Sequence, residues 1–177
     1  ALGPGRGLEL LAEALGRCEP NFTVTLVGNP QGNYAETFSG RIPPAWRGRV
    51  VLEKQLKDRE VLGFMAQHHV GLALEQKQPL NRDLTVTNKI LQYLLCGLAV
   101  VATDTKGQRE IAAKAAGAVQ ICGTNDAKGL AATLSRLAKD TDLLRKLRCQ
   151  ARDAARNRFC WENEAQKLLK QLASPKP

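Results

Sequence analysis

The chain has 177 residues, of which 44% are hydrophobic and 5% are aromatic, so it can form one ordinary domain whose core is mainly aliphatic. Its apolar runs stay below the ~18 residues that a membrane-spanning helix needs, and its first residues lack the pattern of a secretory signal. The formal net charge of +9 leaves nucleic acid, anionic lipid and phosphorylated small ligands open as partners.

The cysteines are scattered, odd in number and without a C-x-x-C pair, which favours the reduced, buried thiols of a cytosolic protein over a disulfide framework or a zinc site. Their positions are Cys18, Cys96, Cys122, Cys149 and Cys160. The adjacent His68 and His69 would point in different directions on a helix, so they make a poor metal pair. Because the sequence begins without Met, we expect a piece excised from a longer protein.

Helix and strand signals alternate through the first part of the chain. Apolar residues recur at helical spacing in some segments, and they alternate with threonine or run together in others. In order, these patterns predict a helix over 7–17, a strand over 22–28, a loop with room for a short helix over 33–47, a strand over 49–52, and a helix over 57–68 with Asp58 as its N-cap.

The alternation continues and then gives way to helices alone. The patterns predict a strand over 70–74, a polar loop over 75–87, a helix over 88–96 that Gly97 ends, a strand over 98–103, a helix over 108–116 and a strand over 118–122. Helices follow over 126–139, 142–159 and 161–173. We expect Asp140 to Asp142 to cap the second of these three, and Trp161 to anchor the third.

Short strands separated by helices of about ten residues are typical of βαβ units and a parallel sheet covered on both faces. The sequence therefore predicts an α/β fold: a Rossmann-like three-layer domain with a parallel sheet and extra C-terminal helices. We expect one domain over 1–177, of which 140–177 is a C-terminal helical extension. In such folds, ligands bind beyond the carboxyl ends of the strands.

The start of the helix over 88–96 combines Thr87, Asn88 and Lys89. A helix N-terminus presents unpaired N–H groups and partial positive charge, which suits a phosphate. A lysine there opposes the helix dipole, and a locally unfavourable charge often marks a site. The alternative is an ordinary capped helix with a surface lysine, and the residues leave both interpretations open.

A glycine-rich stretch, "GPGRGLEL", leads into the first helix and places Arg6 between Gly5 and Gly7. Glycines let backbone N–H groups approach a ligand closely. The stretch matches neither the P-loop nor the G-x-G-x-x-G pattern, so it is a weak signal by itself.

The segment from Leu143 to Phe159 holds six Arg or Lys residues and one Asp. A solvated helix face is the main interpretation, and contact with a membrane surface is the second. Nucleic acid ranks lower because aromatic side chains, which usually accompany RNA-binding basic patches, occur only at its end.

Several stretches in this order, "GRGLELLAEAL", "FTVTLVG", "DREVLGFMAQHHVGLAL", "NKILQYLLCGLAVVATD", "GQREIA" and "FCWE", resemble the C-terminal half of group-1, GT-B-fold glycosyltransferases. The most specific part is Asn88 to Asp104, where family members read like "NKLFEYLAAGLPVVATD". The resemblance covers nearly the whole chain. It implies a domain that binds a nucleotide-sugar donor (NDP-sugar), with the acceptor domain in the absent N-terminal half.

The resemblance also implies site residues. Arg6, beside Gly5 and Gly7, falls where the family's cation contacts the donor diphosphate. Thr87, Asn88 and Lys89 fall on the helix start that cradles the phosphates. Gly28 resembles the residue that closes the second strand beneath the nucleotide, and Leu56 the stretch whose backbone meets the base.

The sequence departs from the family pattern at three positions. Many members carry E-G-F-G-x-x-x-x-E before the A-C-G segment, and counting back places its two glutamates at Leu84 and Gln92. Gln92 can still hydrogen-bond ribose hydroxyls, but without the stronger bonds of a carboxylate. The family's usual arginine before the helix cation falls on Ala1, and its first strand would lie just before that residue.

The resemblance predicts retaining, metal-independent glycosyl transfer without a cofactor, in which Arg6 and Lys89 stabilise the leaving diphosphate. Glu75 could face the sugar, but we expect a solvated loop carboxylate. We expect a cytoplasmic protein, peripheral at a membrane if Leu143–Phe159 contacts one, and no specific nucleic acid. Two alternatives stay open: half of a sugar-nucleotide epimerase, and a basic non-enzymatic interaction module on a vestigial Rossmann-like fold.

Overall fold

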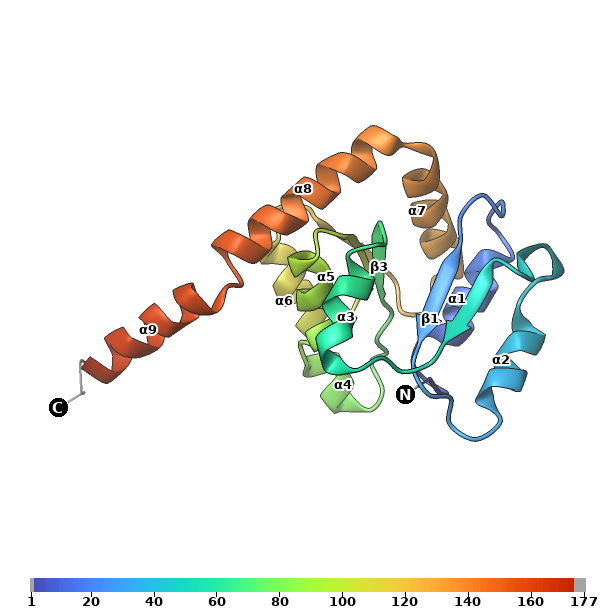
Figure 1. The fold of residues 1–177 in the computed structure, drawn as a ribbon, viewed down its shortest axis with the longest axis horizontal. Coiled ribbons are helices and arrows are strands. Elements are labelled where there is room, and N and C mark those ends of the chain that lie inside the picture. Colours follow the sequence, from blue (N-terminus) through green and yellow to red (C-terminus); the bar gives the residue numbers. More distant parts are fainter. Residues whose placement is uncertain (1, 174–177) are drawn as a thin grey trace.

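The computed structural model describes residues 2–173, in which strands and helices alternate up to the last strand and three helices follow (Figure 1). Ala1, one of the positions that depart from the family pattern, lies outside the described residues. In chain order the elements are α1 (Leu8–Leu15), β1 (Val24–Val27), α2 (Tyr34–Arg41), the short 3-10 helix η1 (Pro44–Trp46), β2 (Val50–Glu53), α3 (Asp58–Met65), β3 (Val70–Ala73), α4 (Leu80–Leu84), α5 (Asn88–Leu95), β4 (Ala99–Thr103), α6 (Lys106–Lys114), β5 (Val119–Cys122), α7 (Ala127–Lys139), α8 (Thr141–Asn157) and α9 (Trp161–Ala173).

The strands pair in parallel, as the sequence predicts, but they form two sheets instead of one. β1 pairs with β2, and β4 lies between β3 and β5. Within residues 2–173 no strand joins β1 to β3. The residues before α1 contribute only an isolated parallel bridge between Leu2 and Pro30, in which the Leu2 amide donates to the Asn29 carbonyl at 2.9 Å.

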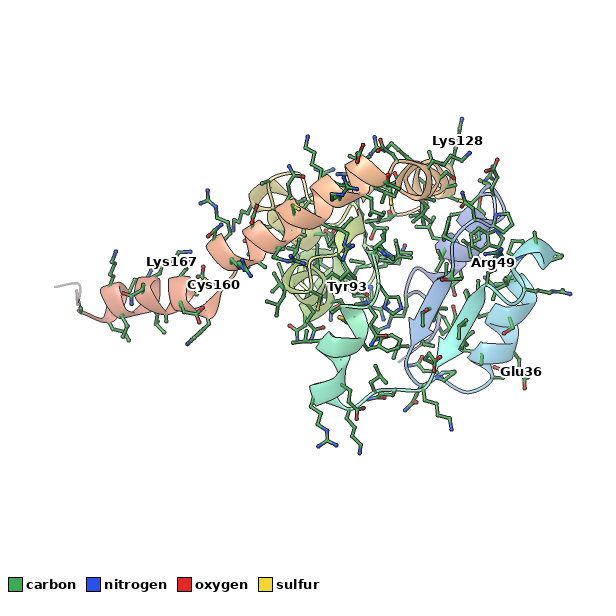
Figure 2. The ribbon with its side chains drawn as sticks, turned by 45° about the horizontal axis from the view of Figure 1, so that its top comes forward. Glu36, Arg49, Tyr93, Lys128, Cys160 and Lys167 are labelled. Carbon is green, nitrogen blue, oxygen red and sulfur yellow. The ribbon has the colours of Figure 1, made fainter. Side chains whose placement is uncertain are left out.

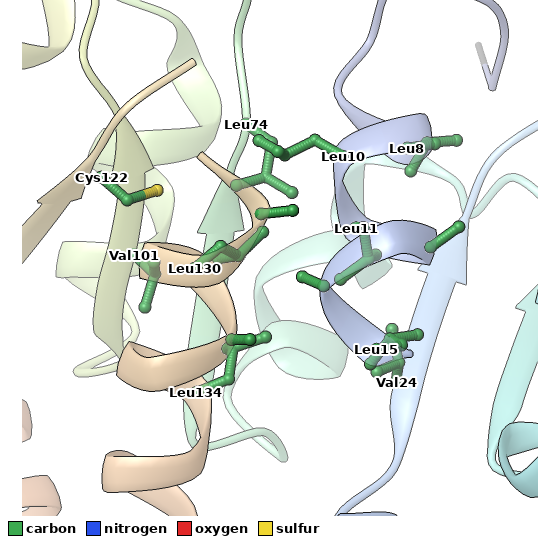
Figure 3. Close-up of a cluster of buried hydrophobic side chains, with 14 of the residues drawn as sticks. Leu8, Leu10, Leu11, Leu15, Val24, Leu74, Val101, Cys122, Leu130 and Leu134 are labelled. Atoms are coloured by element: carbon green, nitrogen blue, oxygen red, sulfur yellow. The ribbon is translucent and has the colours of Figure 1, made fainter. Parts of the chain in front are cut away.

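Buried side chains gather on both faces of β4. Ala99 and Val101 point into a cluster shared with α1 and α7, whereas Val100 and Ala102 point into a cluster shared with α5 and α8. Figure 3 shows the first cluster, where leucines of α1 and α7 approach each other. Because β4 is buried on both faces, its continuous apolar run follows from the fold. The predicted three-layer, Rossmann-like α/β arrangement is confirmed.

Helix α5 shows how local sequence sets the boundaries of an element. Ile90 and Leu94 are four residues apart, so they lie on one face and are both fully buried. Gly97 ends the helix with φ 68°, as predicted. The Leu98 amide donates to the Tyr93 carbonyl at 3.0 Å and the Gly97 amide to the Leu94 carbonyl at 3.0 Å, which is the Schellman pattern.

The segment 33–47, predicted as a loop with room for a short helix, holds the helix α2 and the turn η1. The segment 75–87 was predicted as a loop, and there the structure differs because it holds α4. α4 is too short to be stable by itself. Two hydrogen bonds to distant residues hold it: Arg82 donates to the Gly5 carbonyl, and Asp83 accepts from the Lys106 amide. Asp58 is the first residue of α3, and Lys57 occupies its N-cap position, so the predicted cap is one residue out.

The C-terminal helices follow the predicted order. The Asp140 carboxylate caps α8 by accepting from the Leu143 amide at 2.8 Å, as expected for this segment. α9 extends away from the body of the molecule (Figure 1). Trp161 is 71% exposed, so the expectation that it anchors this helix is wrong. Across residues 2–173, no helix combines the length and the apolar character required to cross a bilayer.

All five cysteines carry free thiols. Cys122 is buried at the end of β5, and this burial, followed by the negative charge of Asp126, raises the pKa of its thiol to about 11. Cys18, Cys96 and Cys160 are half-buried and Cys149 is exposed, so the expectation of buried thiols holds at Cys122 alone.

Candidate functional site

The glycine-rich turn before α1 lies against the carboxyl end of β3. Gly7 has φ 76°, and a Cβ atom there would stand 2.1 Å from the Leu74 carbonyl oxygen. Only glycine combines this backbone conformation with so close an approach. Gly5, with φ 66°, receives a hydrogen bond at its carbonyl from Arg82 of α4, at 2.5 Å. The turn is therefore fixed from two sides, and it leaves Arg6 exposed to solvent.

The N-terminus of α5 opens at the same end of β3. Asn88 is the first helical residue and is exposed, and Thr87 occupies the N-cap position without capping the helix through its side chain. The Thr87 hydroxyl oxygen is buried and has no hydrogen-bond partner within the described residues. A buried hydroxyl without a partner is costly, so the Thr87 hydroxyl is a candidate for a hydrogen bond with a ligand.

Lys89 forms an ion pair with Glu75, which follows the carboxyl end of β3, and its Nζ lies 2.6 Å from Oε1. Glu75 is only 3% exposed, so the expectation of a solvated loop carboxylate is wrong. The carboxylate near the start of α5 offsets the unfavourable position of a lysine in the first turn. Lys89 thus already has an anionic partner from the protein.

A buried polar network fixes the backbone around Glu75. The Thr103 hydroxyl at the end of β4 donates to the Glu75 carbonyl, and the Gln108 side-chain amide donates to the Thr103 carbonyl at 2.9 Å. Gln108 and Thr103 are both fully buried. The carboxyl ends of β3 and β4 are held together by this network, which makes the floor of the site rigid.

Two further residues beside the site were not identified from the sequence. Tyr93 packs against Gly71, where a Cβ atom would stand 2.3 Å from the tyrosine ring. Tyr93 lies near the middle of the molecule in Figure 2. Burial, followed by the negative charge of Glu75, raises the pKa of Tyr93 to about 12. Asp83 of α4 is buried and accepts a hydrogen bond from the Lys106 amide at 3.1 Å. Gly71 within an apolar strand is the one sequence signal for the close approach of an aromatic ring.

An ion pair stands at the carboxyl end of β4. Arg109 donates to both carboxylate oxygens of Asp104, to Oδ2 at 2.6 Å. Hydrogen bonding to Arg109, together with the positive charges of Arg109 and Lys77, lowers the pKa of Asp104. The pair is on the surface, and it fixes the strand end through a bidentate contact.

A cleft of about 580 Å³ runs from the glycine-rich turn along α1. Gly5, Gly7 and Glu9 line one side, and Gln76, which follows the buried Glu75, lines another. Of the predicted site residues, Gly5 belongs to this lining. The others do not: Arg6, Gly28, Leu56, Thr87, Asn88, Lys89 and Gln92. The cleft and the N-terminus of α5 are therefore neighbouring features that meet at the end of β3.

The remaining predicted residues lie at two other places. Pairing of β1 with β2 brings Gly28 close to the segment of Leu56, since the Gly28 amide donates to the Glu53 carbonyl at 3.1 Å. Gln92 is half-buried on α5, one turn after Asn88. All predicted residues except Gln92 thus lie at carboxyl ends of strands or at the helix starts that follow them. Their part in ligand binding stays a prediction.

Comparison with known proteins places the chain in a wider context. The sequence model of a family described as "Glycosyl transferase-like" matches residues 6–170. No curated protein matches the chain.

Solved structures share the fold. HepE from Anabaena, crystallised in complex with UDP, has a TM-score of 0.81 at 21% identity over 97% of this chain and 46% of its own. The C-terminal domain of the group 1 glycosyl transferase LpcC from Francisella tularensis has a TM-score of 0.76 at 14% identity, over 90% of this chain and 84% of its own. Sucrose-phosphate synthase from Thermosynechococcus elongatus has a TM-score of 0.75 at 19% identity, over 96% of this chain and 43% of its own. The chain spans about half the length of HepE.

Proposed function

Since the chain belongs to the glycosyl transferase-like family, we propose that it binds the nucleotide-sugar donor of a retaining, metal-independent glycosyltransferase. The acceptor binds to a domain outside this chain, in the part of the protein that corresponds to the other half of HepE. The UDP in the HepE complex supports a nucleoside diphosphate as the common part of the donor.

One observation carries this proposal: the glycine-rich turn and the N-terminus of α5 meet at the carboxyl end of β3. Gly7 touches Leu74, and the next residue, Glu75, pairs with Lys89. Arg6 adjoins Gly7, and the partnerless Thr87 hydroxyl belongs to the N-cap residue two positions before Lys89, which supports the proposal that both face the diphosphate. Both offer hydrogen-bond donors without a competing acceptor from the described residues, which is what a diphosphate requires.

The proposed chemistry is stabilisation of a leaving group. Transfer breaks the bond between the anomeric carbon of the sugar and the diphosphate oxygen. An acceptor hydroxyl oxygen bonds to that carbon, and its proton passes to the departing diphosphate. The departing diphosphate gains negative charge, and in this proposal Arg6 and the α5 N-terminus stabilise that charge. In this proposal Lys89 adds positive charge near the diphosphate, because its side chain is 44% exposed even though its ammonium pairs with Glu75.

Titration calorimetry with UDP, GDP and ADP tests the proposal. The Arg6→Ala variant should weaken binding of the diphosphates by about tenfold or more, because it removes a charge-assisted hydrogen bond, and should leave uridine binding unchanged. Arg49→Ala is the matched control, since Arg49 is exposed at the amino end of β2 (Figure 2). If no nucleoside diphosphate binds, or if both variants weaken binding equally, the donor site is not here.

A specific observation also supports contact with the surface of a membrane. The basic residues Arg145, Lys146 and Arg156 of α8 are exposed, and α9 exposes Trp161 and Leu172 on its apolar side. We propose that these two helices allow peripheral association with anionic lipid. Flotation with anionic vesicles should carry the chain upward and neutral vesicles should not; equal behaviour with both would contradict the contact.

A further inference from the structure

A second basic feature lies at the opposite end of the sheet from the proposed donor site. A groove of about 380 Å³ runs along α8 and is lined chiefly by Arg145, Arg148 and Arg152, together with His69, Thr141 and Cys149. We call it the α8 groove. His69 precedes β3 at the amino ends of the strands, whereas Glu75 and the donor site lie beyond the carboxyl ends. The two features are therefore separate.

Two guanidinium groups in the α8 groove converge on one residue. Arg148 is half-buried, and its Nε donates to the Gly97 carbonyl at 3.0 Å. The Arg152 guanidinium lies across the same glycine, with Nη2 at 3.1 Å and Nε at 3.2 Å from the place that a Cβ atom would take. Within the described residues neither arginine forms an ion pair with a carboxylate. Arg145 is paired with the exposed Asp142 at 2.9 Å.

This arrangement is unfavourable for the protein alone. Like charges four residues apart on a helix repel each other, and here both are drawn toward one point. The contact of Arg148 with the end of α5 has a structural benefit, because a cation near a helix C-terminus satisfies its carbonyls. Arg152 is exposed, and among the described residues its guanidinium lies over the same glycine without a hydrogen bond to the Gly97 carbonyl.

We propose that the α8 groove binds a phosphate group, held between Arg148 and Arg152 with Arg145 and Thr141 at the edge. Two planar guanidinium groups that converge can donate several parallel hydrogen bonds to phosphate oxygens, which ammonium groups do less well. The groove is large enough for a phosphate and part of the molecule that carries it. The phosphate belongs either to a free ligand or to a lipid headgroup. This site goes beyond the proposed function and does not depend on it.

Two variants with the same change in net charge provide the test. Arg145→Gln/Arg152→Gln removes charge from the α8 groove and spares the structural contact of Arg148. Arg59→Gln/Lys128→Gln removes equal charge from exposed positions on α3 and α7, outside the groove and outside the proposed membrane contact. Both retain residues of good helix propensity, so circular dichroism should show unchanged folding.

Calorimetry with inorganic phosphate measures binding of the free group, and flotation on phosphatidylcholine vesicles with and without phosphatidic acid measures binding of the lipid-borne group. We expect saturable binding in at least one of these assays. The groove variant should weaken it by about tenfold or more, and the control variant by less than about twofold. Arg6→Ala should leave it unchanged, even if the donor site proves wrong. Equal loss in the two double variants, or no saturable binding of either probe, would overturn the proposal.

Discussion

The ion pair between Lys89 and Glu75 gives the sharpest test of how the site is built, because it separates a structural role of Lys89 from a role in binding. Lys89→Ala leaves the Glu75 carboxylate in place with no cation beside it. The side chain of Glu75 is 4% exposed and that of Lys89 is 44% exposed. The pair is therefore half-buried, with its anionic side inside.

The magnitude follows from this burial. Removing one partner of a fully buried pair costs about 3–5 kcal/mol, and exposed pairs contribute less than about 1 kcal/mol. For a buried carboxylate whose partner is half in water we expect the Lys89→Ala variant to lose about 2 kcal/mol of unfolding free energy. Glu75→Gln removes the stranded charge and keeps the shape of the side chain. The double variant should thus recover to within about 1 kcal/mol of the parent.

Urea denaturation followed by tryptophan fluorescence measures these differences, with the slope m unchanged if the folded state stays compact. Lys128→Ala on α7 is the control (Figure 2), since Lys128 is exposed and should change stability by less than about 0.5 kcal/mol. UDP titrations of the same proteins complete the test. UDP affinity should fall in the Lys89→Ala variant and should not recover in the double variant, which also lacks the lysine. A Lys89→Ala variant as stable as the control, or a double variant no more stable than the single one, would refute the reasoning.

Three other predictions concern residues near the candidate site. Gly7→Ala should cost about 3 kcal/mol in urea denaturation, because it adds a backbone clash to the strain of a positive φ, whereas Gly32→Ala, with φ 53° and no atom within 4 Å, should cost only about 1 kcal/mol. Asp104→Asn should lower Tm by less than about 3 °C at pH 7; because bonding to Arg109 depresses the pKa of Asp104 in the folded state, this difference should vanish as pH falls through that pKa. Burial raises the pKa of Tyr93 to about 12, so the folded protein should show no tyrosinate absorbance from Tyr93 near pH 10.5. In the unfolded chain a tyrosine ionises at about 10. The free energy of unfolding should therefore fall as pH rises above about 10.

Local patterns predicted the order of the elements well because they report directly on burial. The run from Leu98 to Thr103 has no polar residue before its end, and β4 is indeed covered on both faces. Gly97 ends α5 as expected because only its own conformation is involved. The strands form two sheets because β1 and β3 are not paired with each other. Pairing between strands that are distant in sequence is not encoded in a local pattern.

The candidate site was predicted in its chain positions but not in its partners. The βαβ pattern predicted that the start of α5 lies beyond the carboxyl end of β3, and the Lys89–Glu75 pair agrees with this. Arg6 was predicted from the family resemblance, and its role stays a prediction. Glu75 looked like a loop residue because it follows a strand and precedes polar residues, and its burial arises from Thr103 and Lys89, which are distant in sequence. α4 escaped prediction for the same reason, since a helix of five residues depends on contacts and not on propensity.

The division of the strands has a consequence for how the molecule opens locally. In the described part of the chain, β4 alone has a strand on each side, and all five of its residues are buried. β2, by contrast, has one neighbour and alternates half-buried with exposed residues. Amide protons of β4 should therefore exchange with solvent deuterium only on global unfolding, while those of β2 exchange through cheaper excursions that detach β1 and β2 and leave the other three strands intact.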